Sequence, residues 1–305
     1  MNTQSNEMPK TPLGPATTPS ATQTRPMYWS IRRELWENRS LYIAPLIAAG
    51  LNLFVFFASS YGFVARRRAT LLMDLAKQRA RIELPYDMVA TILIGTAMIV
   101  GFFYCIDALH NERRDRSILF WKSLPVSDLT TVLSKASIPL FVLPLISFVV
   151  ILGAQLILLF YSSLLLLIHG LPLTTSSQLP LFENTLVLLY GLVVVSLWHA
   201  PIYGWLLLIS GWGRRAQVLW VVFPPLAIAA VEKAVANSTH FAGLVQYRAI
   251  GFMQEAFAFK NGRLDKLAQL TPVKFLTTPG LWIGLVLAAL FIAAAVRQRR
   301  NREPI

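Results

Sequence analysis

The stretch that decides the fold runs from Met88 to Ser127 and reads MVATILIGTAMIVGFFYCIDALHNERRDRSILFWKSLPVS. Its first half is apolar for long enough to cross a bilayer, because about 20 helical residues span a hydrocarbon core of roughly 30 Å. The half that begins at His110 joins a dense charge cluster to bulky apolar residues and ends in a Pro-x-Ser helix start. A linker between two spans needs only to be short and polar. The pattern therefore indicates a protein-docking surface held at the membrane face.

The whole chain has the composition of a polytopic membrane protein. Of its 305 residues, 55% are hydrophobic and 14% are charged, whereas soluble domains are about 25% charged. The apolar runs are continuous rather than alternating, which predicts helices rather than a barrel. Six of them are long enough to span, at about 41–63, 88–108, 138–168, 184–210, 217–235 and 279–297. The sequence thus predicts an all-α polytopic membrane protein with six transmembrane helices.

Two segments precede the first span. Residues 1–26 are rich in Thr, Pro, Ser and Gln and predict a disordered cytoplasmic tail, which leaves 27–305 as the transmembrane domain. Within 27–40, Tyr28, Ile31 and Leu35 recur at helical spacing and predict a short amphipathic helix at the membrane interface. The first apolar run follows too much polar sequence for a cleaved signal peptide, so we expect it to remain as a signal anchor.

Six spans place both termini on one side of the membrane. That side would hold sixteen of the 28 Lys and Arg residues, including the C-terminal cluster that begins at Arg297. The positive-inside rule then assigns both termini to the cytoplasm. The strongly basic connection 64–87, expected as a helical extension of the first span, would lie outside. The connection 236–278 is too polar to span and is either re-entrant or surface-lying.

Several kinds of chemistry have no motif in this chain. A G-x-x-x-x-G-K-[ST] phosphate cradle, an H-E-x-x-H pair and a G-x-S-x-G elbow are all missing from the sequence. The lone Cys105 lies inside the second apolar run and cannot form a disulfide framework. The net charge of +13 resides mainly at span ends and in loops, where it suits anionic membrane lipids rather than nucleic acid. We expect no catalytic residue, metal or cofactor in this chain.

The docking segment carries too many charges for a tight turn but suits a helix that projects beyond the membrane. The apolar residues that follow the charges form the kind of exposed cluster that marks a protein or membrane contact. Ser127 can cap a new helix that runs through Leu129, Val132 and Leu133. The alternative is an interfacial helix lying on lipid. The candidate docking residues are Glu112, Arg113, Asp115, Arg116, Leu119, Phe120, Trp121, Leu124 and Pro125.

The chain resembles the permease subunits of type-two ABC transporters over most of residues 27–300. The resemblance rests on the amphipathic helix, the six spans and a first cytoplasmic loop with the pattern E-R…L-x-x-x-x-L-P-V-S…K. The matching positions are Glu112, Arg113, Leu119, Leu124, Pro125, Val126, Ser127 and Lys135. The basic connection 64–87 departs from what an outer loop would carry.

The resemblance implies a function and several partners. The loop would form a coupling helix that seats in a cleft of a separate ATPase subunit, and that subunit would bind ATP and Mg. The chain would be the permease of an exporter in the bacterial cytoplasmic membrane, paired with a second copy or a sister permease. The alternative function is a non-transport assembly factor or sensor that docks a cytoplasmic partner. A membrane enzyme is disfavoured by the missing motifs.

Within the spans, His199 is the deepest ionisable residue. An intramembrane histidine is a functional hypothesis by default, here a polar residue on a translocation path. The alternative is a neutral imidazole bonded to a backbone carbonyl that Pro201 frees. Small residues at Ala97 and Gly101, and at Gly284 and Ala288, would allow close helix approach.

Overall fold

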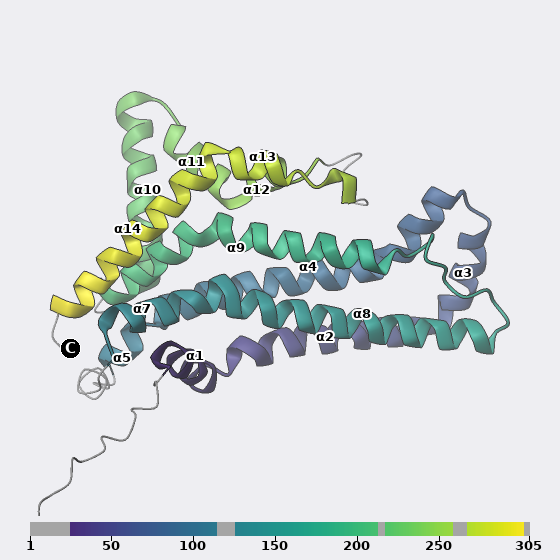
Figure 1. Cartoon of the computed structure of the whole chain (residues 1–305). Coiled ribbons are helices and arrows are strands. Elements are labelled where there is room, and N and C mark those ends of the chain that lie inside the picture. The colour runs from purple at the N-terminus through teal and green to yellow at the C-terminus, as the bar shows by residue number, and fades with distance from the viewer. Residues whose placement is uncertain (1–24, 115–125, 213–216, 259–266, 302–305) are drawn as a thin grey trace, which may run out of the picture.

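The computed structural model describes residues 25–114, 126–212, 217–258 and 267–301. Every named element in these ranges is helical (Figure 1). Six stretches are long and apolar enough to cross a membrane, which confirms the predicted number and is consistent with an integral membrane protein. Their main helices are α2 (Ser40–Ala58), α4 (Leu75–Asp107), α8 (Leu143–Ile168), α9 (Leu181–Trp212), α10 (Gln217–Ala236) and α14 (Pro279–Asn301).

Short elements extend the second and third spans at one end. Helix α5 (His110–Arg114) follows α4, and α7 (Asp128–Ser137) leads through η2 (Ile138–Val142) into α8. Helix α7 begins where the sequence predicts it, because the Ser127 hydroxyl accepts a hydrogen bond from the backbone N–H of Thr130 at 3.1 Å. The second and third spans are therefore continued beyond their apolar runs by helix on both sides of residues 115–125.

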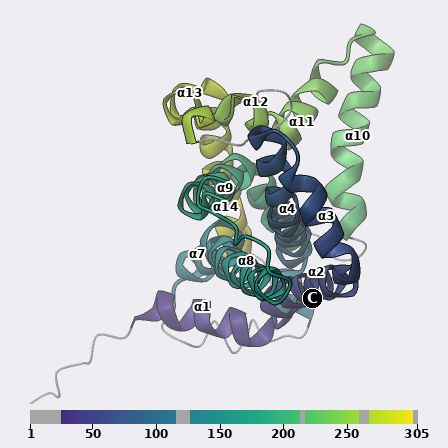
Figure 2. The ribbon, with the colours of Figure 1, turned by 90° about the vertical axis from the view of Figure 1, so that its right-hand side faces the viewer.

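Helices α2, α4, α8 and α9 run side by side, and α14 crosses α9 (Figures 1 and 2). Of the six, α9 is the most buried. The α9–α14 crossing is close because Gly204 faces α14. A Cβ added at Gly204 would lie 3.2 Å from the carbonyl oxygen and 3.3 Å from the Cα of Ala288. On α4, Gly101 likewise faces Leu143 and Tyr203. Small residues thus set helix spacing at Gly101 and Ala288, as expected.

Helix α10 stands apart from this bundle. It is steeply inclined to the four long helices in both views (Figures 1 and 2). Its exposed apolar side chains lie on several sides of the helix and include Leu219, Phe223 and Val231. Because α10 is apolar but hardly covered by the rest of the described chain, it requires lipid or another protein around it.

The expectation that 64–87 extends the first span is wrong. Helix α2 ends at Ala58, where the hydroxyls of Ser59 and Ser60 donate to carbonyls of the last turn and so help to end it. The chain then turns through η1 (Ser60–Gly62) into a separate helix, α3 (Phe63–Leu71). Residues 75–87 belong to the second span instead.

The connection 236–278 folds back onto the bundle. Its described helices are α11 (His240–Ile250), α12 (Phe252–Ala256), η3 (Leu267–Gln269) and α13 (Pro272–Thr277). Phe252 and Phe275 share an apolar cluster with Trp198, which lies near the middle of α9. The predicted disordered tail falls almost wholly on residues 1–24, outside the described ranges.

The Gly204 contact predicts a packing defect. We expect Gly204→Leu to lower the free energy of unfolding by about 1–3 kcal/mol, because the side chain would drive α9 and α14 apart. Gly153→Leu is the matched control, since nothing lies within 4 Å of a Cβ built at Gly153. It should leave stability unchanged or slightly raised, because leucine favours helix over glycine. Thermal unfolding of the two variants in detergent measures both effects, and equal midpoints would contradict the close approach.

Candidate functional site

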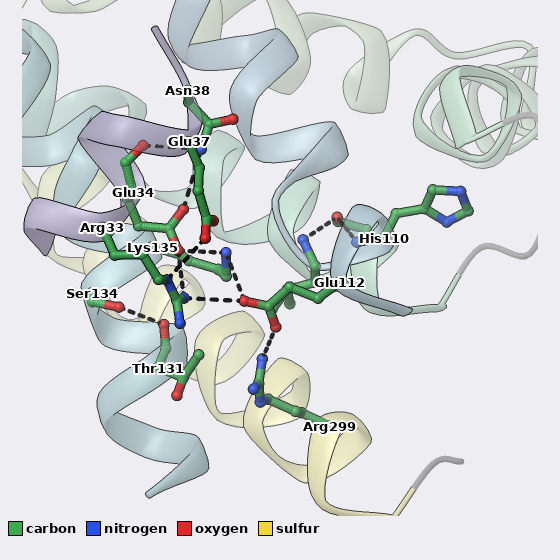
Figure 3. A network of polar contacts seen from close by, with 12 residues as sticks. Arg33, Glu34, Glu37, Asn38, His110, Glu112, Thr131, Ser134, Lys135 and Arg299 are labelled. Atoms are coloured by element: carbon green, nitrogen blue, oxygen red, sulfur yellow. Dashed lines mark hydrogen bonds and ion pairs between the residues drawn. The ribbon is translucent and has the colours of Figure 1, made fainter. Parts of the chain in front are cut away.

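A buried cluster of charged side chains joins four helices at one end of the bundle. Helix α1 (Pro26–Glu37) runs at a steep angle to the long helices at this end (Figures 1 and 2). Between α1 and the bundle lie three acids and three bases, drawn with their neighbours in Figure 3 except for Asp128. We call this set the charge cluster; its members are Arg33, Glu34, Glu112, Asp128, Lys135 and Arg299.

The centre of the charge cluster is a ring in which cations and carboxylates alternate. Lys135 Nζ donates to Glu34 Oε1 at 2.7 Å and lies 3.1 Å from Glu112 Oε1. The Arg33 Nη2 group makes the same two contacts, at 2.8 Å to Glu34 and 3.2 Å to Glu112. Each of the two cations therefore bridges both carboxylates (Figure 3). Positive groups thus separate the Glu34 and Glu112 carboxylates around the ring.

Further bonds tie this ring to α4, α7 and α14. The Tyr104 hydroxyl donates to Glu34 Oε2 at 2.8 Å. Arg299 pairs with Glu112 through Nη1, and its Nε donates to Asp128 Oδ1 at 3.0 Å. The amphipathic helix, the end of the second span, the start of the third and the end of the last are thus held at one point.

Four of the six charges of this cluster are buried, whereas Arg33 and Asp128 are partly exposed. The side chains of Glu34 and Lys135 are 0% and 2% exposed. Burial alone would raise the pKa of Glu34, but Lys135 and then Arg33 hold this pKa below its ordinary value. Glu34 is therefore ionised at neutral pH, and its charge is matched inside the protein.

The structure turns Glu112 inward, whereas the sequence suggested it as a docking contact. Its side chain is 8% exposed and paired within the chain, so it anchors the docking segment rather than presenting a carboxylate to a partner. Arg113 belongs to α5, and its side chain is not described. The other candidates, Asp115, Arg116, Leu119, Phe120, Trp121, Leu124 and Pro125, lie outside the described residues.

Described residues on both sides of segment 115–125 belong to the charge cluster. Glu112 precedes the segment 115–125, and Asp128 opens the helix that follows it. Both residues bind Arg299. Lys135, which matches the last position of the resemblance pattern, meets Glu112, which matches the first. Any displacement of the segment would therefore act on α1 and α14 as well as on the second and third spans.

Sequence reasoning missed Glu34 and Arg299. Ile31 and Leu35 of the predicted apolar face do pack against the core, and Glu34 lies on the same side of α1. An acid on the apolar side of an amphipathic helix was the available signal. The outer side of α1 carries Trp29 and Trp36, with the Arg32 guanidinium 5.3 and 4.6 Å from their ring centres.

His199 is buried between α9 and α11. Its Nδ1 lies 2.8 Å from the carbonyl oxygen of Val195, and its Nε2 lies 3.2 Å from that of Ala249. The carbonyl that Pro201 deprives of its partner would be that of Leu197, which is not among the contacts of the imidazole. A neutral ring carries one N–H, so it donates either to Val195 or to Ala249 and not to both. Here the ring links α9 to the folded-back connection.

Comparisons with protein-family models, with curated proteins and with solved structures find no match to this chain. The site must therefore be interpreted from its own geometry. Within the described ranges, no group of three or more His, Cys, Asp or Glu residues could hold a metal ion.

Removing one carboxylate from the ring should destabilise the protein strongly. In Glu34→Gln, Lys135 and Arg33 are left sharing the Glu112 carboxylate, with only the half-exposed Glu37 also near Arg33, and breaking a buried pair costs about 3–5 kcal/mol. Glu37→Gln is the control, because the Glu37 side chain is 50% exposed and lies 3.7 Å from Arg33. The free energy of unfolding of Glu37→Gln should fall by less than about 1 kcal/mol. Unfolding in detergent measures both variants, and similar losses would contradict a structural role for the ring.

The pH dependence of the same measurement gives a second readout. Because the folded protein holds the pKa of Glu34 below the ordinary 4.5, its stabilisation is complete above that pH. It is lost as the pH falls through the lowered pKa. The difference between wild type and Glu34→Gln should therefore be constant near neutral pH and shrink in acid.

Proposed function

We propose that this chain is the permease subunit of an ATP-driven ABC transporter, an exporter by its resemblance, with ATP hydrolysed by a separate subunit. The observation that carries the proposal is that Glu112 and Asp128, which lie before and after segment 115–125, both pair with Arg299. A partner that binds this segment would be connected through the charge cluster to four helices. No catalysis within this chain is required, and ATP and Mg would belong to the partner.

The mechanism follows from the connectivity of the charge cluster. ATP binding would draw two ATPase subunits together and move the docking segments seated in them. Since Glu112 and Asp128 share Arg299, a displacement of either residue would strain its pairing with Arg299 and so be passed to the other. The motion would reach α1 through Glu34 and would bias an inward-facing against an outward-facing arrangement of the spans.

The orientation is part of the proposal. The charge cluster brings α1 and the last turns of α14 to one end of the bundle, so both termini leave from the same end. We assign that end to the cytoplasmic face of the bacterial membrane, because the basic C-terminal cluster lies there. Trp29 and Trp36 on the outer side of α1 suit the headgroup region, where amphipathic aromatic rings concentrate.

A second permease, either another copy or a sister chain, completes the proposed assembly. Two ATPase subunits need two docking segments, and this chain supplies one. Helix α10 supports the pairing, since its apolar surface has little cover from its own chain. A partner helix packed on α10 would bury that surface and could change its steep inclination to the bundle.

The docking role predicts a selective loss of the ATPase. The test co-expresses this chain with a soluble P-loop ATPase encoded beside it; the lack of such a neighbour would itself count against the proposal. Leu119→Asp should lower co-purification at least about tenfold, because a charge in a buried contact centre costs about 2 kcal/mol or more. Leu72→Asp is the control, since Leu72 is 89% exposed at the opposite end and should change nothing.

Unchanged capture of the ATPase by Leu119→Asp would contradict the docking role. ATP turnover by the purified chain without a partner would contradict its place as a non-catalytic subunit.

The orientation predicts which end reacts from outside the cell. Cys105 is the single cysteine of the chain and is buried, so labelling of the wild type should be weak. A membrane-impermeant maleimide applied to intact spheroplasts should label Leu72→Cys but not Ser117→Cys, and lysis should expose both. Labelling of Ser117→Cys before lysis would reverse the proposed topology.

A further inference from the structure

A cavity of about 520 Å³ opens at the end of the bundle opposite the charge cluster. It lies among α2, α3, α4 and α8, at the right-hand end of Figure 1. Its lining runs from Asn52 in α2 to Ser59, the residue after that helix, over a length of about 10 Å at the helical rise. Its volume falls within the range of about 300–1,000 Å³ that is typical of small-molecule sites.

The lining of this cavity is amphipathic. Much of the lining is apolar and includes Val55, Phe56, Val89 and Leu158. Its charged residues are Arg66, Arg67 and Arg81, and no carboxylate lines it. The acids of α4 that neighbour lining residues along the chain are Glu83, which is paired with Arg79 at 2.9 Å, and Asp87; neither is among the residues that line the cavity. The cavity therefore combines an apolar interior with a purely cationic set of charges.

Arg67 is the most informative of these cations. The residue is 5% exposed, and its Nη2 donates only to neutral oxygens, those of Thr174 at 3.0 Å and Gln178 at 3.2 Å. Its Nε is buried with no hydrogen-bond partner, and within the described ranges its guanidinium makes no ion pair. Burial lowers the pKa of Arg67 accordingly.

A buried charge without a counter-ion is costly, and proteins normally pair it. The same chain does so at its other end, where Arg33 and Arg299 each meet a carboxylate. At the α3 end the missing counter-ion has to come from outside the described chain. An anion alone would leave the apolar walls unused, whereas a lipid tail alone would leave Arg67 unpaired.

We infer that this cavity binds an anionic lipid with a single acyl chain. Its headgroup would lie on Arg66, Arg67 and Arg81, and its acyl chain along Val55, Phe56 and Leu158. The inference does not rest on the proposed transport function. It also gives three arginines of the basic connection 64–87 a role as ligands of a lipid headgroup.

The test compares three probes on the purified full-length chain in a neutral maltoside detergent. Native mass spectrometry titrates lysophosphatidylglycerol, which has one tail and an anionic head, lysophosphatidylcholine, which has the same tail and a zwitterionic head, and glycerol 3-phosphate, which has the head alone. We expect one saturable site for the first probe, binding about tenfold weaker for the second, and none for the third. Equal affinity for both lipids, or equally tight binding of glycerol 3-phosphate, would overturn the inference.

Charge variants locate the site. Arg81→Gln should weaken the binding of lysophosphatidylglycerol about tenfold, because the variant loses a charge-assisted contact to the headgroup. The Arg81 side chain is exposed at the cavity and has no ion pair to lose, so folding should not suffer. Arg67→Gln should weaken binding at least as much, provided its unfolding midpoint is kept.

Arg68→Gln is the matched control. It removes the same charge from the next residue of α3, which is exposed and does not line the cavity. Its affinity should equal that of wild type. If Arg68→Gln weakens binding as much as Arg81→Gln, or if Arg81→Gln has no effect, the attraction is general to the basic helix and the site is refuted.

Discussion

The position of α1 and of both ends of the docking segment depends on the ring formed by Glu34, Lys135, Glu112 and Arg33. Buried ions lose their hydration, and only close contact with opposite charge restores what water supplied. Each cation of the ring touches both carboxylates, so displacing one helix would leave charges from two others unpaired. Such clusters add little stability over an apolar core, but they penalise every misaligned arrangement. We interpret the ring as a device that fixes one geometry.

The two ends of the bundle handle positive charge in opposite ways. At the α1 end, Arg33, Lys135 and Arg299 are matched by carboxylates of the same chain. At the α3 end, Arg67 is buried against neutral oxygens only. The first arrangement holds protein segments together, and the second leaves a positive charge to be neutralised by something else. This asymmetry supports a partner protein at one end and anionic lipid at the other.

Much of the fold was predictable because it follows from local patterns. Continuous apolar length specified the six spans, and Ser127 specified the start of α7 through its hydroxyl. The prediction that 64–87 extends the first span was wrong. The hydroxyls of Ser59 and Ser60 donate to carbonyls of the last turn of α2 and help to end it, and a hydrophobicity pattern does not reveal such local hydrogen bonds. In the site, Glu112 was recognised as important but given the wrong direction. Its partner Arg299 is 187 residues away, and no spacing rule reaches that far.

The sequence by itself determined that this chain is helical, that six segments can cross a membrane, and that a charged, aromatic segment lies between the second and third. These properties depend on the solvation of neighbouring residues along one helix or loop. Only the tertiary structure decided which acids meet which bases, that Glu112 faces inward, and that no carboxylate among the described residues pairs with Arg67. Those outcomes depend on which helix ends are brought together, because ion pairing acts over a few ångströms between residues far apart in the chain.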